Sequence, residues 1–220
     1  MNKKIILTGA KGRLSQIILQ TLTEYDFTLI DLPELDLKDY DKMLEIFPNH
    51  DAVVHLAWDS KGENWKNNSL NLDNIKIACN VYKLAMETKI PKVIMLSSIH
   101  ADSYLNRSTD NYISIDRNPI PDSPYGVSKI FIEKLGQYYA SNYDLKVICP
   151  RIGGVNGSDN PNLDEKYYNR IWLSKKDFCD IIKKGIEIEN IPNNFCVFYA
   201  VSNNKERMHN INNQIGWKPE

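Results

Sequence analysis

The sequence is poor in cysteine, and none of its cysteines has metal-binding spacing. The four lie far apart and form no Cys-x-x-Cys pair: Cys79, Cys149, Cys179 and Cys196. Zinc sites and thioredoxin-like redox motifs are built on such pairs, so the spacing argues against both. Free cysteines usually behave as small buried hydrophobes, and we expect these to be reduced core thiols. No metal site is predicted.

The chain also lacks a charge bias and a long apolar run. Lys and Arg number 27 against 28 Asp and Glu, and basic residues gather only in short pairs, which argues against a nucleic-acid partner. No run approaches the roughly 20 apolar residues of a membrane span. The apolar residues 5–8 are too few for a signal peptide. We therefore expect a cytoplasmic protein that acts on a small molecule, away from membranes.

Strand-like and helix-like segments alternate along the 220 residues, of which 42% are hydrophobic. Strands are expected at 3–8, 27–30, 52–56, 92–97, 145–149 and 195–200, and helices at 14–22, 40–47, 74–88, 125–139 and 175–184. This alternation predicts an α/β fold, a Rossmann-like doubly wound parallel sheet. The length suits one core. We expect a cofactor-binding core at residues 1–150, with a reduced C-terminal substrate-binding portion at 151–220 packed on it as one structural unit.

A glycine turn follows the first expected strand and opens the first helix. It reads Thr-Gly-Ala-Lys-Gly-Arg-Leu-Ser at residues 8–15, which is the context that a dinucleotide fingerprint requires. Gly9 permits the turn, and Gly12 lets the backbone approach a pyrophosphate, whose charge the helix amino terminus favours. The third position of the fingerprint, normally Gly or Ala, is Ser15. Because that position serves close helix–strand packing, we expect a small Ser to be tolerated.

Asp31 ends the second expected strand, about 20 residues beyond the glycines. A carboxylate in that place accepts hydrogen bonds from the adenosine ribose and repels a 2′-phosphate. The sequence therefore favours NAD over NADP. The alternative is that Lys11 or Arg13, beside the turn, holds a phosphate.

Three residues have the chemistry of proton transfer. Ser98 directly follows the fourth expected strand, and Tyr125 and Lys129 lie one turn apart at the start of the next helix. A phenol has an unperturbed pKa of about 10, so it acts as a base near neutral pH only beside a cation such as Lys129. Ser98 would hold the reacting oxygen of the substrate.

With these motifs the chain resembles the extended short-chain dehydrogenase/reductase family, the NAD-dependent epimerase/dehydratase group. Further family-like segments are 35–37, 54–57, 150–154 and 215–219, together with Asn74. In the family the counterpart of Asp36 contacts adenine, and residues like 54–57 pass under the cofactor. The resemblance implies an NAD-dependent enzyme whose cofactor-binding residues are Gly9, Lys11, Gly12, Arg13, Leu14, Asp31, Asp36, Leu37, Leu56, Ala57, Trp58, Asn74, Tyr125, Lys129 and Ile152.

Within this group the chain is most similar to uronate dehydrogenases, through residues 97–100, 125–129 and 151–153 with 172–178. That likeness implies a substrate site made by Ser60, Ser98, Ile99, His100, Tyr125, Gly153 and Arg170. Ile99 replaces a substrate-binding Asn of those enzymes. Arg170 lies two or three residues from the place of their carboxylate-binding Arg. The resemblance also implies a homodimer formed through the helices at 74–88 and 125–139.

The sequence thus favours oxidation of a small sugar or sugar acid, since a chain this short has little material to grip a nucleotide-linked sugar. Two alternatives stay open: a sugar epimerase or dehydratase, in which the hydride returns to the substrate, and an NAD-binding regulator that has lost its chemistry. His100 is either a substrate ligand or an ordinary loop histidine. Trp58 either shapes the pocket or fills the core.

Overall fold

Seven strands form one parallel sheet in the computed structural model, which describes residues 2–60, 62–102, 112–161 and 168–220. The strands are β1 (Lys4–Thr8), β2 (Asp26–Ile30), β3 (Ala52–His55), β4 (Lys92–Met95), β5 (Ser97–Ser98), β6 (Lys146–Ile152) and β7 (Phe195–Ala200). Their order is β2-β1-β3-β4-β6-β7, with β5 continuing beyond β4 along the same edge of β6. The predicted Rossmann-like sheet is confirmed.

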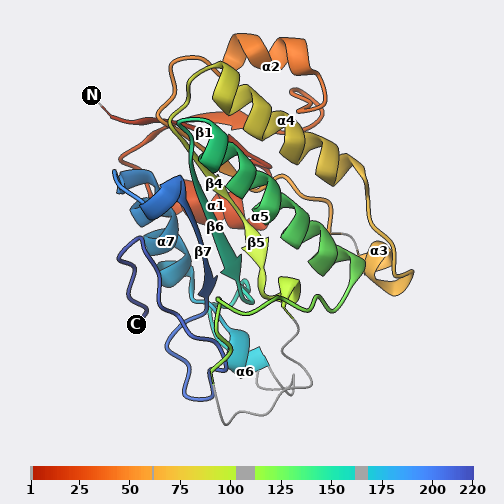
Figure 1. The fold of residues 1–220 in the computed structure, drawn as a ribbon, viewed down its shortest axis with the longest axis vertical. Helices are drawn as coiled ribbons and strands as arrows, with labels where there is room; N and C mark the ends of the chain where they lie inside the picture. The colour runs from red at the N-terminus through yellow and green to blue at the C-terminus, as the bar shows by residue number, and fades with distance from the viewer. Residues whose placement is uncertain (1, 61, 103–111, 162–167) are drawn as a thin grey trace.

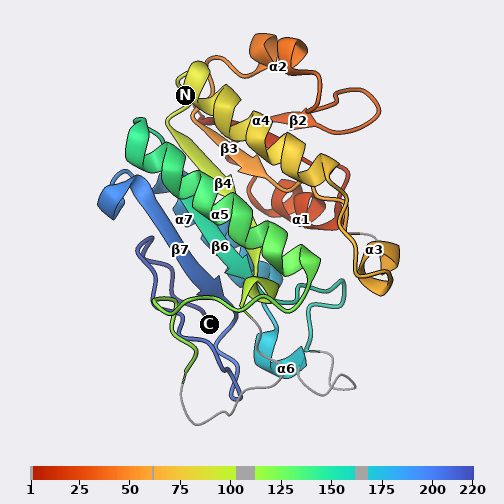
Figure 2. The ribbon, with the colours of Figure 1, turned by 45° about the vertical axis from the view of Figure 1, so that its right-hand side comes forward.

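Helices cover both faces of the sheet, as Figure 1 and Figure 2 show. On one face lie α1 (Arg13–Thr21) and α7 (Lys175–Glu187); on the other lie α2 (Tyr40–Ile46), α4 (Asp73–Glu87) and α5 (Pro124–Asn142). Each face has its own apolar core. Strands covered on both sides read as continuous apolar runs, and every residue of β3 is accordingly buried.

The start of α5 is set by local sequence. The Ser123 hydroxyl oxygen accepts a hydrogen bond from the Gly126 backbone N–H at 3.1 Å, and Pro124 occupies the first turn, where a missing N–H costs little. The cap therefore holds Tyr125 in the first turn of α5, with Lys129 one turn further along the same face.

The strand order reverses at β1. The chain pairs β1 with β2 on one side and with β3 on the other. In open α/β sheets, ligands bind in the crevice outside the carboxyl ends of the strands at such a point. The glycine turn that follows β1 therefore lies where this fold places a ligand.

Two predicted strands have different limits in the structure. The strand expected at 92–97 is divided at Leu96, whose carbonyl oxygen accepts a hydrogen bond from Lys129 Nζ at 3.0 Å. The strand expected at 145–149 runs on to Ile152, because its far end pairs with β5 and β7. Two short helices, α3 (Gly62–Lys66) and α6 (Tyr168–Ile171), were not predicted. They are too short to show a helical period.

Residues after 150 join the sheet and one of its cores. β7 pairs with β6, and α7 packs on the face that also carries α1. Near the end of the chain, Ile215 and Trp217 are buried in the same core. Between His100 and Ser123, where the polar and Pro-containing sequence predicts a long loop, residues 103–111 lie outside the described residues. None of the described helices is long and apolar enough to cross a membrane.

Candidate active site

The glycine turn between β1 and α1 is tight and admits no side chain at its first position. Gly9 has φ +67°, and a Cβ placed on it would lie 2.7 Å from the backbone nitrogen of Ala57. The Gly9 N–H donates to the carbonyl oxygen of Ile30, and the Gly12 N–H donates to that of Gly9, both at 2.9 Å. The turn therefore brings the α1 amino terminus next to the 56–59 segment, with backbone and not side chain lining the approach.

Ser15 replaces the third glycine without opening the turn. Its side chain is buried and its hydroxyl donates to the carbonyl oxygen of Gly9 at 2.7 Å. The extra polar atom is therefore satisfied inside the motif, which explains why the helix still packs closely on the sheet.

Asp31 lies at the end of β2, at the edge of a cavity that Asp36, Leu37, Ala57 and Asn74 also line. Its carboxylate accepts hydrogen bonds from the backbone N–H groups of Lys11 at 2.6 Å and Leu32 at 2.8 Å. These bonds fix the carboxylate at the mouth of the glycine turn. A hydroxyl pair presented there would meet a preoriented acceptor.

The two cations beside the turn have protein partners. Lys11 Nζ lies 2.6 Å from Glu34 and donates to the carbonyl oxygen of Leu32 at 2.8 Å. Arg13 donates to the carbonyl oxygen of Val155 at 2.9 Å. Lys11 is thus directed toward a carboxylate, and Arg13 crosses from the turn toward the loop that follows β6.

Asn74 fixes the segment that runs under the cavity. Its amide oxygen accepts from the Asp59 N–H at 2.8 Å, and its amide nitrogen donates to the Asp59 carbonyl oxygen at 2.9 Å. At the other end of the segment, the Leu56 and Ala57 N–H groups donate to Thr8 Oγ1. Leu56 to Trp58 are thereby held as a rigid floor between the two glycines and α4.

Ser98, Tyr125 and Lys129 meet at the carboxyl end of the sheet. A hydrogen bond joins the side chains of Tyr125 and Ser98. Burial of the phenol raises the pKa of Tyr125, and the Ser98 hydrogen bond opposes that rise. Lys129 Nζ lies 5.5 Å from the centroid of the Tyr125 ring. The three residues are therefore within reach of one small molecule, with the phenol protonated near neutral pH until a cation stabilises its ionised form.

Lys129 is buried deep in the site. Its ammonium donates to the Leu96 carbonyl oxygen and lies 3.4 Å from the centroid of the Trp58 ring. Desolvation lowers the pKa of Lys129 to about 7, against an opposing effect of the Glu133 carboxylate. Trp58 also meets the Tyr125 ring edge-on, with centroids 6.4 Å apart. The Trp58 indole is therefore part of the site, as a wall over the lysine.

The burial of Lys129 has a consequence for stability. An unfolded lysine keeps its proton up to a pKa of about 10.4, whereas the folded protein releases it at about 7. Between these values the unfolded chain binds more protons, so stability rises with pH. We expect the Tm of the native protein to rise relative to that of Lys129→Met as pH increases from 7 to 10. Thermal unfolding at several pH values measures this.

The exposed Lys134 on the same helix provides the control. Lys134→Met should leave the Tm difference from the native protein independent of pH. A Lys129→Met difference that is equally flat, or that runs in the opposite direction, would contradict the burial of a cation at this place.

His100 and Ser60 face the same cavity as Ser98 and Tyr125. Its volume is about 380 Å³, and it is also lined by Gly153, Gly154 and Tyr168. His100 Nδ1 lies 2.8 Å from Asp122 Oδ2, and its ring meets that of Tyr125 edge-on, with centroids 5.9 Å apart. Asp122 thus orients the imidazole beside the phenol.

Two predicted substrate residues lie elsewhere. Ile99 is 2% exposed and packs with Ile113, Tyr199 and other apolar side chains in a third core cluster. Arg170, on α6, lies 3.3 Å from Glu206. Neither is among the residues that line the cavity beside Tyr125.

Several lining residues were not foreseen from sequence. They come from α3, the segment after it, and α6: Asn64, Ser69, Leu70, Asn71 and Tyr168. Polar residues in short irregular segments carry no periodic signal, so no sequence pattern indicated this wall of the cavity. A Cβ on Gly154 would lie 2.6 Å from the Tyr168 ring.

The cavities join into one cleft along the carboxyl edge of the sheet. Gly9 and Trp58 line both the cavity at Asp31 and the one at Lys129, while Arg13 and Tyr125 line both the latter and the cavity at His100. A long ligand therefore fits from Asp31 to Tyr125, with room for a small second ligand beyond it. Among the described residues, no group of three or more His, Cys, Asp or Glu is placed to hold a metal ion.

A parallel doubly wound sheet with a glycine turn at its switch point and a Ser-Tyr-Lys set beside it defines a Rossmann-like protein of the short-chain dehydrogenase type. Residues 5–173 match the model of the NAD dependent epimerase/dehydratase family. The chain belongs to this enzyme family, and the family predicted from the sequence is confirmed.

Curated relatives are sugar dehydrogenases. L-arabinose 1-dehydrogenase (NAD(P)(+)) of Haloferax volcanii is 29% identical, over 98% of this chain and 96% of its own. Uronate dehydrogenase of Pseudomonas syringae pv. tomato is 25% identical, over 92% of this chain and 75% of its own. Among solved structures, a mutant uronate dehydrogenase from Agrobacterium tumefaciens complexed with NAD has a TM-score of 0.83 at 24% identity, covering 100% of this chain and 85% of its own.

Proposed function

We propose that this protein is an NAD-dependent oxidoreductase that oxidises a hydroxyl group of a small sugar or sugar acid. The observation that carries the proposal is the junction of two cavities at Tyr125, one reaching back to the glycine turn and one bounded by Ser98 and His100. The curated relatives named as L-arabinose and uronate dehydrogenases support the substrate class.

The residues present fit a dinucleotide. Gly9 and Gly12 leave backbone room for a pyrophosphate at the α1 amino terminus, with Lys11, Arg13 and Leu14 beside them. The Asp31 carboxylate would accept hydrogen bonds from the adenosine ribose hydroxyls, and Asp36 and Leu37 would flank adenine. Asn74 would support the floor under the cofactor, and Ile152 would lie near the nicotinamide. The fixed Asp31 carboxylate supports NAD over NADP, since a 2′-phosphate would be repelled there.

In the proposed mechanism, NAD supplies the hydride acceptor when bound, and the protein handles the proton. Ser98 hydrogen-bonds the substrate oxygen, and Tyr125 Oη takes the proton from the substrate hydroxyl. The Lys129 ammonium stabilises the phenolate that must form first. The substrate carbon loses a hydride and its oxygen a proton, so a hydroxyl becomes a carbonyl. His100, oriented by Asp122, holds a second hydroxyl of the sugar from the far side of the cavity.

The open alternative is a sugar epimerase or dehydratase, in which the hydride returns to the substrate. The two are separated by measuring net NADH formation with a panel of aldoses and uronates. We expect NADH to accumulate with at least one of them, in proportion to the sugar consumed. Sugar isomerisation without NADH would show that the epimerase alternative is right, and NAD binding without turnover of any sugar would favour the regulator.

We also propose that the protein works as a homodimer in the cytoplasm. On α5, Val127, Phe131 and Tyr138 are 54%, 44% and 51% exposed and lie at helical spacing on one face, which supports a partner there. The four cysteines are free, which suits a reducing compartment.

A further inference from the structure

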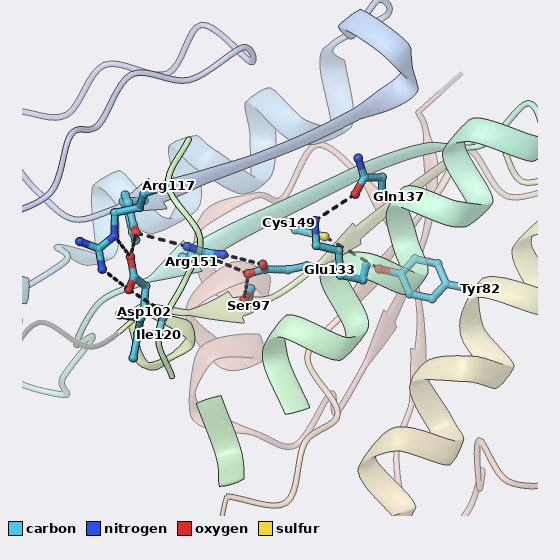
Figure 3. A network of polar contacts seen from close by, with 11 residues as sticks. Tyr82, Ser97, Asp102, Arg117, Ile120, Glu133, Gln137, Cys149 and Arg151 are labelled. Carbon is cyan, nitrogen blue, oxygen red and sulfur yellow. Dashed lines mark hydrogen bonds and ion pairs between the residues drawn. The ribbon is translucent and has the colours of Figure 1, made fainter. Parts of the chain in front are cut away.

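A chain of buried charged and polar side chains lies directly behind the catalytic residues. Arg151, on β6, donates to both carboxylate oxygens of Glu133, on α5, at 2.8 and 2.7 Å. The Ser97 hydroxyl donates to the same carboxylate at 2.5 Å. Figure 3 shows the three side chains converging between helix and sheet. All three are at most 3% exposed.

This hydrogen-bond network continues from Arg151, away from α5, to a second buried carboxylate. Arg151 Nη1 donates to Tyr199 Oη at 3.2 Å, and Tyr199 Oη donates to Asp102 Oδ2 at 2.8 Å. Asp102 is fully buried and accepts two bonds from Arg117 and one from the Ile120 N–H. Figure 3 places Arg117, Asp102 and Ile120 at one end of the drawn network, on the other side of Arg151 from Glu133.

At the helix end, the network touches the residues next to the catalytic set. Glu133 follows Lys129 by one turn of α5, and Ser97 precedes Ser98 in β5. Lys129 binds the Leu96 carbonyl oxygen, while Glu133 binds the Ser97 hydroxyl. Helix α5 therefore holds two consecutive residues, Leu96 between β4 and β5 and Ser97 in β5, and this double attachment sets the position of Ser98 relative to Tyr125.

At the loop end, the network fixes the far wall of the cavity. Arg117 and Ile120 lie just before Asp122, which bonds to His100. Asp102 thus anchors the stretch that presents Asp122. The stretch that carries Asp122 is thereby linked, through Asp102, Tyr199 and Arg151, to the Glu133 carboxylate, which lies one turn of α5 from Lys129.

A contribution to folding stability does not by itself explain a buried network of charged side chains. Buried ion pairs lose most of their Coulombic gain to desolvation, and neutral replacements of similar volume are often as stable. Along the network the charges alternate in sign, from Arg117 through Asp102, Arg151 and Glu133 to Lys129. Each buried charge is thereby matched, and the last in the series is the catalytic lysine.

We propose that Glu133 and Arg151 are positioning residues for the reaction. They hold Ser98 and Lys129 in fixed positions relative to each other. Through Tyr199 and Asp102 they also connect these two residues to the wall of the cavity that carries His100. The inference rests on the proposed function for its reaction. It adds to that function two residues that touch neither substrate nor cofactor.

The main test neutralises the pair without emptying its space. In Glu133→Gln/Arg151→Gln the two amides can bond to each other, to Ser97 and to Tyr199. We expect Tm and NAD affinity to stay near native values, while kcat falls roughly ten- to a hundredfold, the loss that follows small misplacement of reacting groups. The charged or titratable groups around Lys129 are Tyr125 and Glu133 on its own helix, Cys149 on β6 and His55 on β3. Loss of the Glu133 charge should move the alkaline limb of kcat/KM to lower pH.

Tyr199→Phe is the second variant, because it cuts the network between Arg151 and Asp102 and leaves both ion pairs in place. We expect it to raise KM more than it lowers kcat, since the wall with His100 is loosened while Lys129 keeps its neighbour. Native kcat and an unmoved pH profile in the double variant would overturn the proposal, and so would a loss of activity that only follows the loss of folded protein.

A measurement without substrate separates this proposal from the proposed function. The pH at which the Tm difference between each protein and its Lys129→Met counterpart begins to change should fall when Glu133 and Arg151 are neutral. If the native protein oxidises no sugar yet this pH shifts, the proposed function fails and the coupling of Glu133 to Lys129 stands. If sugars are oxidised and the pH does not shift, the coupling fails alone.

Discussion

Tyr125→Phe is expected to lower kcat by about 10² to 10⁴-fold, the usual contribution of a positioned general base. The substitution removes one hydroxyl and leaves the ring, which still packs edge-on against Trp58 and His100. NAD affinity and Tm should therefore change little. Steady-state kinetics with the best sugar substrate, together with cofactor titration, measure both quantities.

The exposed Tyr138, on the same helix, gives the matched control. Tyr138→Phe also removes one phenolic hydroxyl from α5 and should keep native kcat. If Tyr125→Phe keeps native kcat as well, another group takes the proton from the substrate, and the role assigned to the Ser-Tyr-Lys set is wrong.

Gly9→Ala is expected to weaken NAD binding by roughly tenfold or more, a loss of at least about 1.4 kcal/mol. The added Cβ would lie 2.7 to 2.9 Å from backbone atoms of Leu56 and Ala57 and would sit on a residue with φ +67°. Backbone strain of this kind costs about 1 to 3 kcal/mol, so Tm should fall by several degrees as well. Cofactor titration and thermal unfolding report the two effects.

Gly157→Ala is the control for this substitution. A Cβ on Gly157 meets nothing within 4 Å, so cofactor affinity and Tm should stay native. Tight NAD binding by Gly9→Ala would mean that the cofactor does not lie over this turn, and the assignment of the cleft would have to be abandoned.

The parts of the site foreseen from sequence are those with a local signal. Gly9 and Gly12 stand between an apolar strand and a helical repeat, and Tyr125 and Lys129 stand one turn apart behind a Ser-Pro helix start. Such patterns depend on residues within about one turn of each other. The fold follows from the same kind of evidence, since alternating strands and helices leave few ways to cover both faces of a sheet.

The buried network had no such signal. Ser97, Glu133, Arg151 and Tyr199 belong to four separate elements, and only the strand register, which pairs Arg151 with Ser97 and with Tyr199, brings them together. Glu133 and Arg151 read in the sequence as ordinary charged residues. Their burial became apparent only when the positions of α5 and β6 were known.

Ile99 illustrates a further limit of reasoning from sequence. The resemblance placed it at the substrate, because an Asn occupies that position in uronate dehydrogenases. In the structure its side chain packs with Tyr199 and Val201 in the third core cluster and is not among the residues that line the cavity beside Tyr125. Sequence alignment gives the place of a residue along the chain, whereas the direction of its side chain depends on the short helix (Ile99–Ala101) that follows β5.

The most direct test of the account follows the hydride. The native protein would be incubated with NAD and L-arabinose or a uronate deuterated at C1, and the nucleotide and sugar would be analysed by mass spectrometry. We expect deuterated NADH in amounts equal to the oxidised sugar, with transfer lost in Tyr125→Phe. Deuterium that stays entirely in the sugar pool while NADH is absent would contradict it.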